Sequence, residues 1–176
     1  YGRAGCDGCH SGAFLTDHGF HAMGQPQLGP GKAERFQTHQ RDTGRQRVTG
    51  RPEDAYAFRT PSLRNVLRTS PWGHAGAFTD IRAFVVHHAK VGGGFREYTR
   101  DVVLPELEGI ADDWAIMEDS NESEAIVKSA AQHEITLTSD DIDSLVAFLG
   151  ALSDPVALGG RLGIPDRVPS GLPIDR

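Results

Sequence analysis

The sequence predicts a mainly α-helical fold with long loops. Two segments, 81–88 and 138–149, show the spacing of amphipathic helices, with apolar residues recurring every three or four positions. A third observation, 21 Gly and 10 Pro in 176 residues, indicates more loop than is usual in a globular protein. A chain of this length is sufficient for one domain with a sizeable core. We therefore expect residues 1–176 to form a single domain.

The N-terminal part is expected to hold a short helix followed mostly by loop. Residues 2–11 predict a helix that ends near Gly12. Residues 12–55 show little periodicity and are punctuated by glycine and proline, which indicates loop with short helical turns. A loop this long in a compact domain is usually functional or packed on a bound group. Thr60 and Pro61 predict the start of a further short helix, because threonine suits the cap and proline suits the first helical position.

The clearest helix-forming pattern in the middle of the chain follows Thr79. Thr79 is predicted to cap a helix that runs to about Ala89 and is stopped by the three glycines at 92–94. Its apolar face is formed by positions i, i+3, i+4 and i+7, which are Ile81, Phe84, Val85 and His88. The pattern therefore places a histidine on an apolar face, where an imidazole needs a partner.

The C-terminal part is expected to contain loop, a surface helix and one strongly patterned helix. Residues 95–135 are mixed and acidic, which predicts loop and a surface helix. Thr138 opens a helix that is acidic in its first turn and apolar at Ile142, Leu145, Val146, Phe148 and Leu149. From Pro155 onward the chain is rich in proline and glycine, so we expect it to lie extended on the surface.

The run Cys6-Asp7-Gly8-Cys9-His10 has the pattern C-x-x-C-H. This pattern is typical of c-type haem attachment, in which two thiols form thioethers with the haem vinyl groups and the histidine binds the iron. Zinc and thioredoxin-like redox chemistry are the alternatives for C-x-x-C. The chain has only 2 Cys, so a site of four thiolates is impossible, and no βαβ pattern surrounds them. We therefore expect one covalent haem c, held by Cys6 and Cys9, with His10 as an axial ligand.

The charge and hydropathy of the chain limit its partners. A net charge of −6 provides no basic surface for nucleic acid. This negative charge is compatible with the docking of a basic redox protein, but acidity that serves only solubility is the more common explanation. No apolar run approaches the ~18 residues of a membrane span.

The position of the haem motif suggests that Tyr1 is not the natural start. Haem is attached outside the bacterial cytoplasm, so we expect an export signal upstream and a periplasmic or otherwise exported protein. A haem-binding helix also usually needs a turn or more ahead of its first cysteine, and Cys6 has only a short segment before it.

The second axial ligand decides between electron transfer and catalysis, because an open position can admit substrate. His88 is favoured among the candidates because its helix places it among apolar side chains. The other candidates are Met23, His18, His21, His39, His74, His87, Met117 and His133.

Further segments occur in an order that resembles one family, the bacterial di-haem cytochrome c peroxidases and their MauG-type relatives. After C-x-x-C-H these segments are 14–17, 20–26, 42–45, 48–50, 58–66, 69–76, 145–149 and 168–173. The resemblance is to the C-terminal haem domain of the family, since the chain has no second C-x-x-C-H. It implies a cytochrome c-like haem domain with three principal helices around the haem, long loops and at most a short hairpin.

The resemblance also implies a function. The chain looks like the electron-transfer haem domain of a di-haem peroxidase-like oxidoreductase, which receives electrons from a small redox protein and relays them to a peroxide-reacting haem on a second domain or subunit. The alternative is a free-standing mono-haem electron carrier. A third possibility is an enzyme in which His88 dissociates to admit peroxide.

In the family the sixth ligand follows the histidine of a His-x-Gly turn by fourteen residues, and is Met in the peroxidases and Tyr in MauG. Counting from His74 in this sequence leads to His88. Bis-His ligation by His10 and His88 is therefore the leading interpretation, with a lower reduction potential than a His/Met site. His87 remains the rival if the helix register differs, and Met23 stays open.

Three other assignments follow from the resemblance. Arg59 and Arg64 look like partners of the haem propionates, with surface arginines as the alternative. Backbone oxygens of Thr69 and Pro71 correspond to calcium ligands, and whether calcium is bound here is left open. Trp72 is either an electron-path residue or a packed aromatic.

Overall fold

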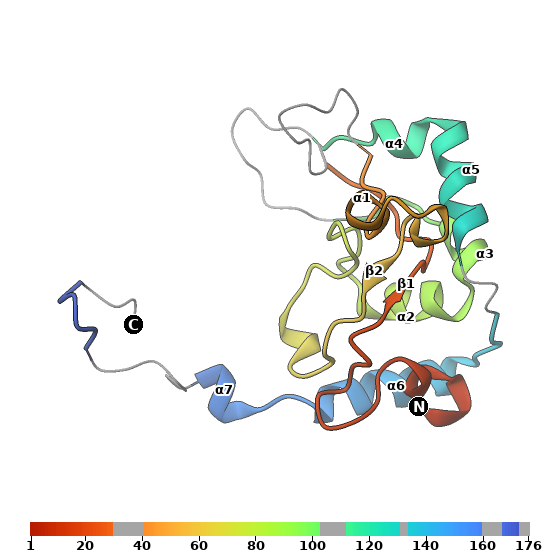
Figure 1. Ribbon diagram of the computed structural model, residues 1–176. Helices are drawn as coiled ribbons and strands as arrows, with labels where there is room; N and C mark the ends of the chain where they lie inside the picture. Colours follow the sequence, from red (N-terminus) through yellow and green to blue (C-terminus); the bar gives the residue numbers. More distant parts are fainter. Residues whose placement is uncertain (30–40, 103–111, 131–133, 160–166, 173–176) are drawn as a thin grey trace.

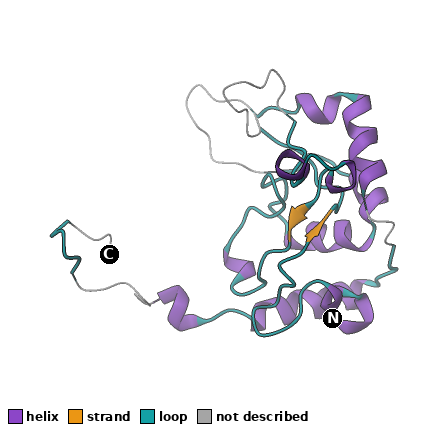
Figure 2. Cartoon of the chain, viewed as in Figure 1, coloured by secondary structure: helices purple, strands orange, loops and turns teal. Residues whose placement is uncertain are grey.

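The computed structural model describes residues 1–29, 41–102, 112–130, 134–159 and 167–172, and in these ranges the chain is mainly helical with long loops (Figures 1 and 2). This confirms the expected mainly α fold. The helices are α1 (Gln46–Thr49), α2 (Ile81–Ala89), α3 (Val91–Arg96), α4 (Ala115–Glu118), α5 (Ser120–Ser129), α6 (Ser139–Ala151) and α7 (Pro155–Gly159). Short 3₁₀ helices span Gly2–Ala4, Cys6–Gly8, Pro52–Asp54 and Val66–Arg68.

Two short strands join segments that are distant in the chain. β1 (Phe20–His21) pairs antiparallel with β2 (Phe58–Arg59), so the pair is not a hairpin. The pairing continues as a hydrogen bond from the Thr60 backbone N–H to the Gly19 carbonyl at 3.0 Å. The segment that follows the C-x-x-C-H motif is thereby held against the segment that begins at β2.

Helix α2 begins one residue later than the sequence suggests. Its cap is Asp80, whose carboxylate accepts a hydrogen bond from the Arg82 backbone N–H at 2.9 Å, and not Thr79. The glycines at 92–94 do not end the helical region, because they lie inside α3. A Cβ at Gly94 would stand 3.0 Å from the Cα of His87. Glycine is therefore needed here so that α3 can pack closely on α2.

Helix α6 matches its predicted start and connects two parts of the molecule. Thr138 and Asp141 form a capping box at its first turn. This start could be predicted because a capping box depends only on residues that are close together in the sequence. Near the C-terminal end of α6, Phe148 packs against the Tyr1 ring, with centroids 4.6 Å apart and the ring planes tilted by 36°. Asp143 of the same helix pairs with Arg82 of α2. Helix α6 therefore contacts both the segment that carries the haem motif and α2 (Figure 1).

Three other expectations differ from the structure. The N-terminal helix is replaced by two 3₁₀ turns separated by Gly5, whose φ of 68° interrupts a regular helix. No helix begins at Pro61, and the 3₁₀ turn Val66–Arg68 lies further along. The tail begins with α7 and not as an extended segment.

The described core contains two clusters of packed side chains. One is formed by Leu28, Ala77 and Phe78, and the other by Tyr56, Phe95 and Ile126. Leu145 and Leu149 of α6 are also buried, and neither cluster includes the haem motif.

Candidate haem site

The two cysteines of the motif are free thiols, and both are half-buried. The Cys6–Gly8 turn brings them onto one side, and the His10 backbone N–H donates to the Cys6 carbonyl at 2.9 Å. Burial raises the pKa of both thiols. A compact turn with two unpaired thiols followed by a histidine matches the donor set that attaches a c-type haem.

His10 is held in a defined orientation. Its Nδ1 lies 3.2 Å from the Leu15 carbonyl, which can only accept a hydrogen bond, so Nδ1 carries the proton. In this tautomer the lone pair is on Nε2, the nitrogen through which the imidazole would bind iron. Burial lowers the pKa of His10, which favours the neutral imidazole that binds iron. Leu15 has a φ of 53°, an unusual conformation for leucine that helps to aim this carbonyl.

His88 shows the same arrangement on α2. Its Nδ1 lies 3.0 Å from the Phe84 carbonyl, so the lone pair is again on Nε2. The imidazole is half-buried and meets the Phe84 ring edge-on at 4.4 Å. His10 and His88 therefore have the tautomer that an axial haem ligand requires.

His87, the rival candidate, is packed in the interior. It is 2% exposed, and its Nε2 donates to the Met23 carbonyl at 3.0 Å. Its lone pair is consequently on Nδ1, which is buried with no hydrogen-bond partner among the described residues. A Cβ at Gly94 would lie 3.0 Å from this nitrogen, so α3 covers it closely. These contacts favour a structural role for His87.

The apolar faces of α2 and α6 are incompletely covered by protein. The predicted face of α2, formed by Ile81, Phe84, Val85 and His88, is only half-buried, whereas the buried residues of this helix are His87 and Ala89. On α6, Leu145 and Leu149 are buried but Ile142, Val146 and Phe148 are half-exposed. Adjacent apolar surfaces of this kind suit a flat apolar group such as a porphyrin.

The remaining ligand candidates have other partners in the structure or lie outside it. The Met117 sulfur accepts from the Gln27 backbone N–H at 3.4 Å, and His18 contacts Arg59 at 3.5 Å. The Met23 side chain is half-buried. His39 and His133 lie outside the described residues.

His74 forms a hydrogen-bonded pair with the buried Asp42. Its Nε2 donates to Asp42 at 2.9 Å, and its ring stacks on Phe58 with centroids 3.5 Å apart. Asp42 also accepts from the Gly44 backbone N–H at 2.9 Å. The hydrogen bond from His74 is the main cause that lowers the pKa of Asp42 to about 2. Sequence reasoning missed Asp42, because nothing local distinguishes a buried loop carboxylate from an exposed one.

Replacing Asp42 with asparagine is expected to lower the free energy of unfolding at pH 7 by about 1–2 kcal/mol, after allowance for solvent screening. The native pKa is depressed, so this stabilisation is present above the ordinary carboxyl pKa of 3.8 and disappears as the pH falls toward 2. Urea unfolding of both proteins at pH 7 and at pH 3 measures the difference. Asp112→Asn, at an exposed position, is the control and should change stability by less than about 0.5 kcal/mol. An equal deficit at both pH values would contradict the assignment.

Arg59 and Arg64, the predicted propionate partners, are exposed residues of the segment that begins at β2. The guanidinium of Arg64 donates to the Ala13 carbonyl at 2.7 Å, and that of Arg59 donates to the Thr60 carbonyl at 3.2 Å. Within the described ranges neither guanidinium pairs with a carboxylate, which leaves both able to bind a propionate.

Thr69 and Pro71, the predicted calcium ligands, are exposed. The Thr69 hydroxyl donates to the Val66 carbonyl at 3.0 Å. Trp72 donates from its indole to the same carbonyl at 2.8 Å and packs at the edge of the Leu28 cluster. Its contacts are those of a packed aromatic residue.

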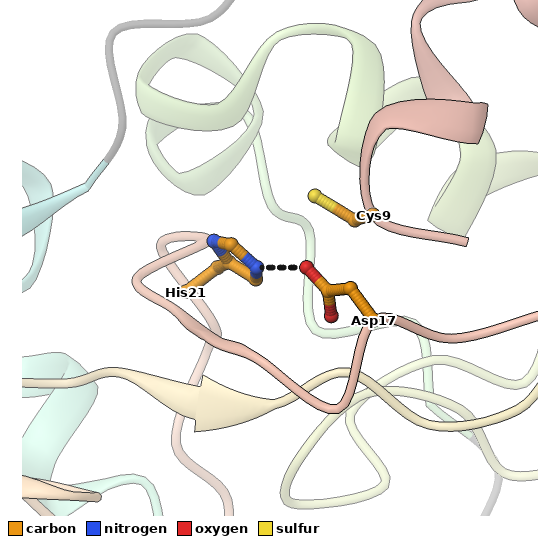
Figure 3. Close-up of side chains that lie close together, drawn as sticks. All are labelled: Cys9, Asp17 and His21. Atoms are coloured by element: carbon orange, nitrogen blue, oxygen red, sulfur yellow. Dashed lines mark hydrogen bonds and ion pairs between the residues drawn. The ribbon is translucent and has the colours of Figure 1, made fainter. Parts of the chain in front are cut away.

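Asp17 and His21 lie beside Cys9, which the sequence did not indicate (Figure 3). The ligand atoms of the three residues all lie within 4.8 Å of one another. Since Asp17 and His21 are not in a helix, their spacing of four residues gave no signal that they interact.

The two free thiols and the oriented His10 are the donor set that the C-x-x-C-H pattern of c-type haem attachment requires. Comparisons with known proteins agree with this class. Cytochrome-c peroxidase IdrP1 of Pseudomonas sp. (strain SCT) is 32% identical over 111 residues, which are 52% of this chain and 29% of that protein. Methylamine utilization protein MauG of Methylorubrum extorquens is 36% identical over 93 residues, which are 52% of this chain and 23% of that protein.

A solved structure of similar fold is also known. The crystal structure of a MauG-like protein associated with microbial copper homeostasis has a TM-score of 0.53 with 22% identity, over 87% of this chain and 43% of that chain. No protein-family model matches the sequence. The chain spans about a quarter to a third of the curated relatives. It is a relative of the bacterial cytochrome c peroxidases and MauG proteins, which confirms the resemblance.

None of the helices in the described ranges has the length and apolarity that a membrane crossing requires.

Proposed function

We propose that the chain is an electron-transfer haem c domain of a cytochrome c peroxidase-like or MauG-like oxidoreductase, with a cytochrome c-like fold. The observation that carries the proposal is that the imidazoles of His10 and His88 have the same tautomer. Each has its Nδ1 at hydrogen-bond distance from a backbone carbonyl, which favours the tautomer that binds iron through Nε2. Two such imidazoles close both axial positions of an iron, and a closed iron suits electron transfer better than reaction with a substrate.

The protein's residues have separate tasks in this proposal. Cys6 and Cys9 hold the haem covalently. His10, from the haem motif, and His88, from α2, bind the iron. The bound haem supplies one-electron redox chemistry. Arg59 and Arg64 bind propionates through their guanidinium forks. Calcium at the backbone oxygens of Thr69 and Pro71 stays a prediction.

The partners follow from the same proposal. The domain receives electrons from a small redox protein and passes them to a second haem on another domain or subunit. It works in the periplasm or in another exported location, where haem c is attached.

The proposal is tested with the chain exported alongside a haem-attachment system. The haem should stay bound in a denaturing gel, the ferric protein should be low-spin, and it should consume no more hydrogen peroxide with a donor dye than a protein-free blank. The His88→Ala variant, with its sixth position opened, is the positive control for peroxide reactivity. Turnover by the wild-type chain as fast as by His88→Ala would contradict an electron-transfer role.

A further inference from the structure

A carboxylate lies beside the haem motif, and the proposed function does not use it. The Asp17 carboxylate accepts from His21 Nε2 at 2.8 Å through one oxygen and from the Gly19 backbone N–H at 2.7 Å through the other. Figure 3 shows the pair next to Cys9, and a carboxylate oxygen of Asp17 lies within 4.8 Å of the Cys9 sulfur. That sulfur is the atom that would bond to a haem vinyl group.

The backbone fixes Asp17 relative to the motif. Its N–H donates to the Cys9 carbonyl at 2.7 Å. The preceding residue, Thr16, is buried and donates its hydroxyl to the Thr60 carbonyl at 2.7 Å. One residue earlier, the Leu15 carbonyl orients His10. The segment 15–17 therefore holds the axial histidine, the second cysteine and the carboxylate in one arrangement.

The charge of Asp17 acts on the motif. The hydrogen bond from His21, followed by that from Gly19, lowers the pKa of Asp17 to about 2, so this carboxylate is ionised at neutral pH. A carboxylate oxygen of Asp17 lies within 4.8 Å of the Cys9 sulfur, so this charge lies beside the attachment position and next to the residue that precedes His10.

We propose that Asp17, held in place by His21, tunes the haem electrostatically and lowers its reduction potential. This rests on the haem of the proposed function. Reduction adds one electron to the iron–porphyrin unit, and a fixed negative charge nearby disfavours that addition and stabilises the ferric state. The competing explanation is purely structural, with Asp17 serving only to tie the 17–21 turn. A structural role alone would leave the potential of an intact haem unchanged.

The experiment is a spectroelectrochemical titration of the haem-loaded chain at pH 8 with Asp17→Asn, Asp17→Glu and the control Glu124→Gln. Asparagine keeps the size of the side chain but removes the charge. We expect its reduction equilibrium constant to rise about threefold to tenfold, which is about 30–60 mV for one electron. The shift should shrink at high salt. Asp17→Glu should restore most of the wild-type potential. Glu124→Gln removes an equal charge on α5 and should have no effect.

A second variant tests the same idea while keeping the carboxylate. His21→Arg places a permanent cation against Asp17 and should raise the potential in the same direction as Asp17→Asn. Both variants should retain the low-spin spectrum of the wild type. If both potentials equal that of Glu124→Gln while the haem remains low-spin, tuning by Asp17 is wrong. A wild-type chain that attaches no haem would overturn the proposed function together with this one, so the two failures are distinguishable.

Discussion

Replacing His88 with alanine is expected to convert the ferric haem from low-spin to high-spin. In the proposed site His88 is the sixth ligand and lies on a half-buried helix face, so removing the imidazole would empty the sixth coordination position. Water or peroxide can then enter. Low-temperature electron paramagnetic resonance and the optical spectrum of the ferric protein measure the change.

His88→Met is the informative companion variant. Methionine can supply a sulfur ligand from the same position, so the iron should remain low-spin. The potential should rise by roughly 0.1–0.3 V, a fraction of the ~0.8 V over which axial ligands tune haem proteins. If neither substitution changes the spectrum, the sixth ligand is a different residue.

Replacing His87 with alanine is expected to lower the free energy of unfolding by about 2–4 kcal/mol, without changing the haem spectrum. The side chain is 2% exposed, and its ring lies 5.1 Å from that of Phe78. Alanine would leave a cavity and would deprive the Met23 carbonyl of its donor. Urea unfolding of the haem-loaded chain, followed by circular dichroism, measures the loss.

His18→Ala is the matched control for this prediction, since His18 is exposed and its loss should cost less than about 0.5 kcal/mol. A high-spin spectrum from His87→Ala, with His88→Ala unchanged, would reverse the assignment of the two neighbouring histidines.

The features that could be predicted from the sequence depend on residues close together in the chain. The haem motif is a run of five consecutive residues. The start of α6 is set by one capping box between Thr138 and Asp141. The start of α2 was misplaced by one residue, because Thr79 and Asp80 are both competent caps and only the fold selects between them. The glycines at 92–94 predict the end of a helix, whereas in the structure Gly94 allows α3 to approach His87 of α2 closely.

For the site itself, the sequence predicts covalent attachment through Cys6 and Cys9, an axial role for His10 and the placement of His88 on an apolar helix face, and the attachment and the ligation stay predictions. These follow from valence and helical periodicity, which are local properties. The burial of His87 against Gly94, the carbonyl partners of His10 and His88, and the Asp17–His21 pair beside Cys9 emerge only in three dimensions. Each depends on contacts between segments whose approach is set by packing and by loop geometry, and no spacing along the chain encodes those contacts.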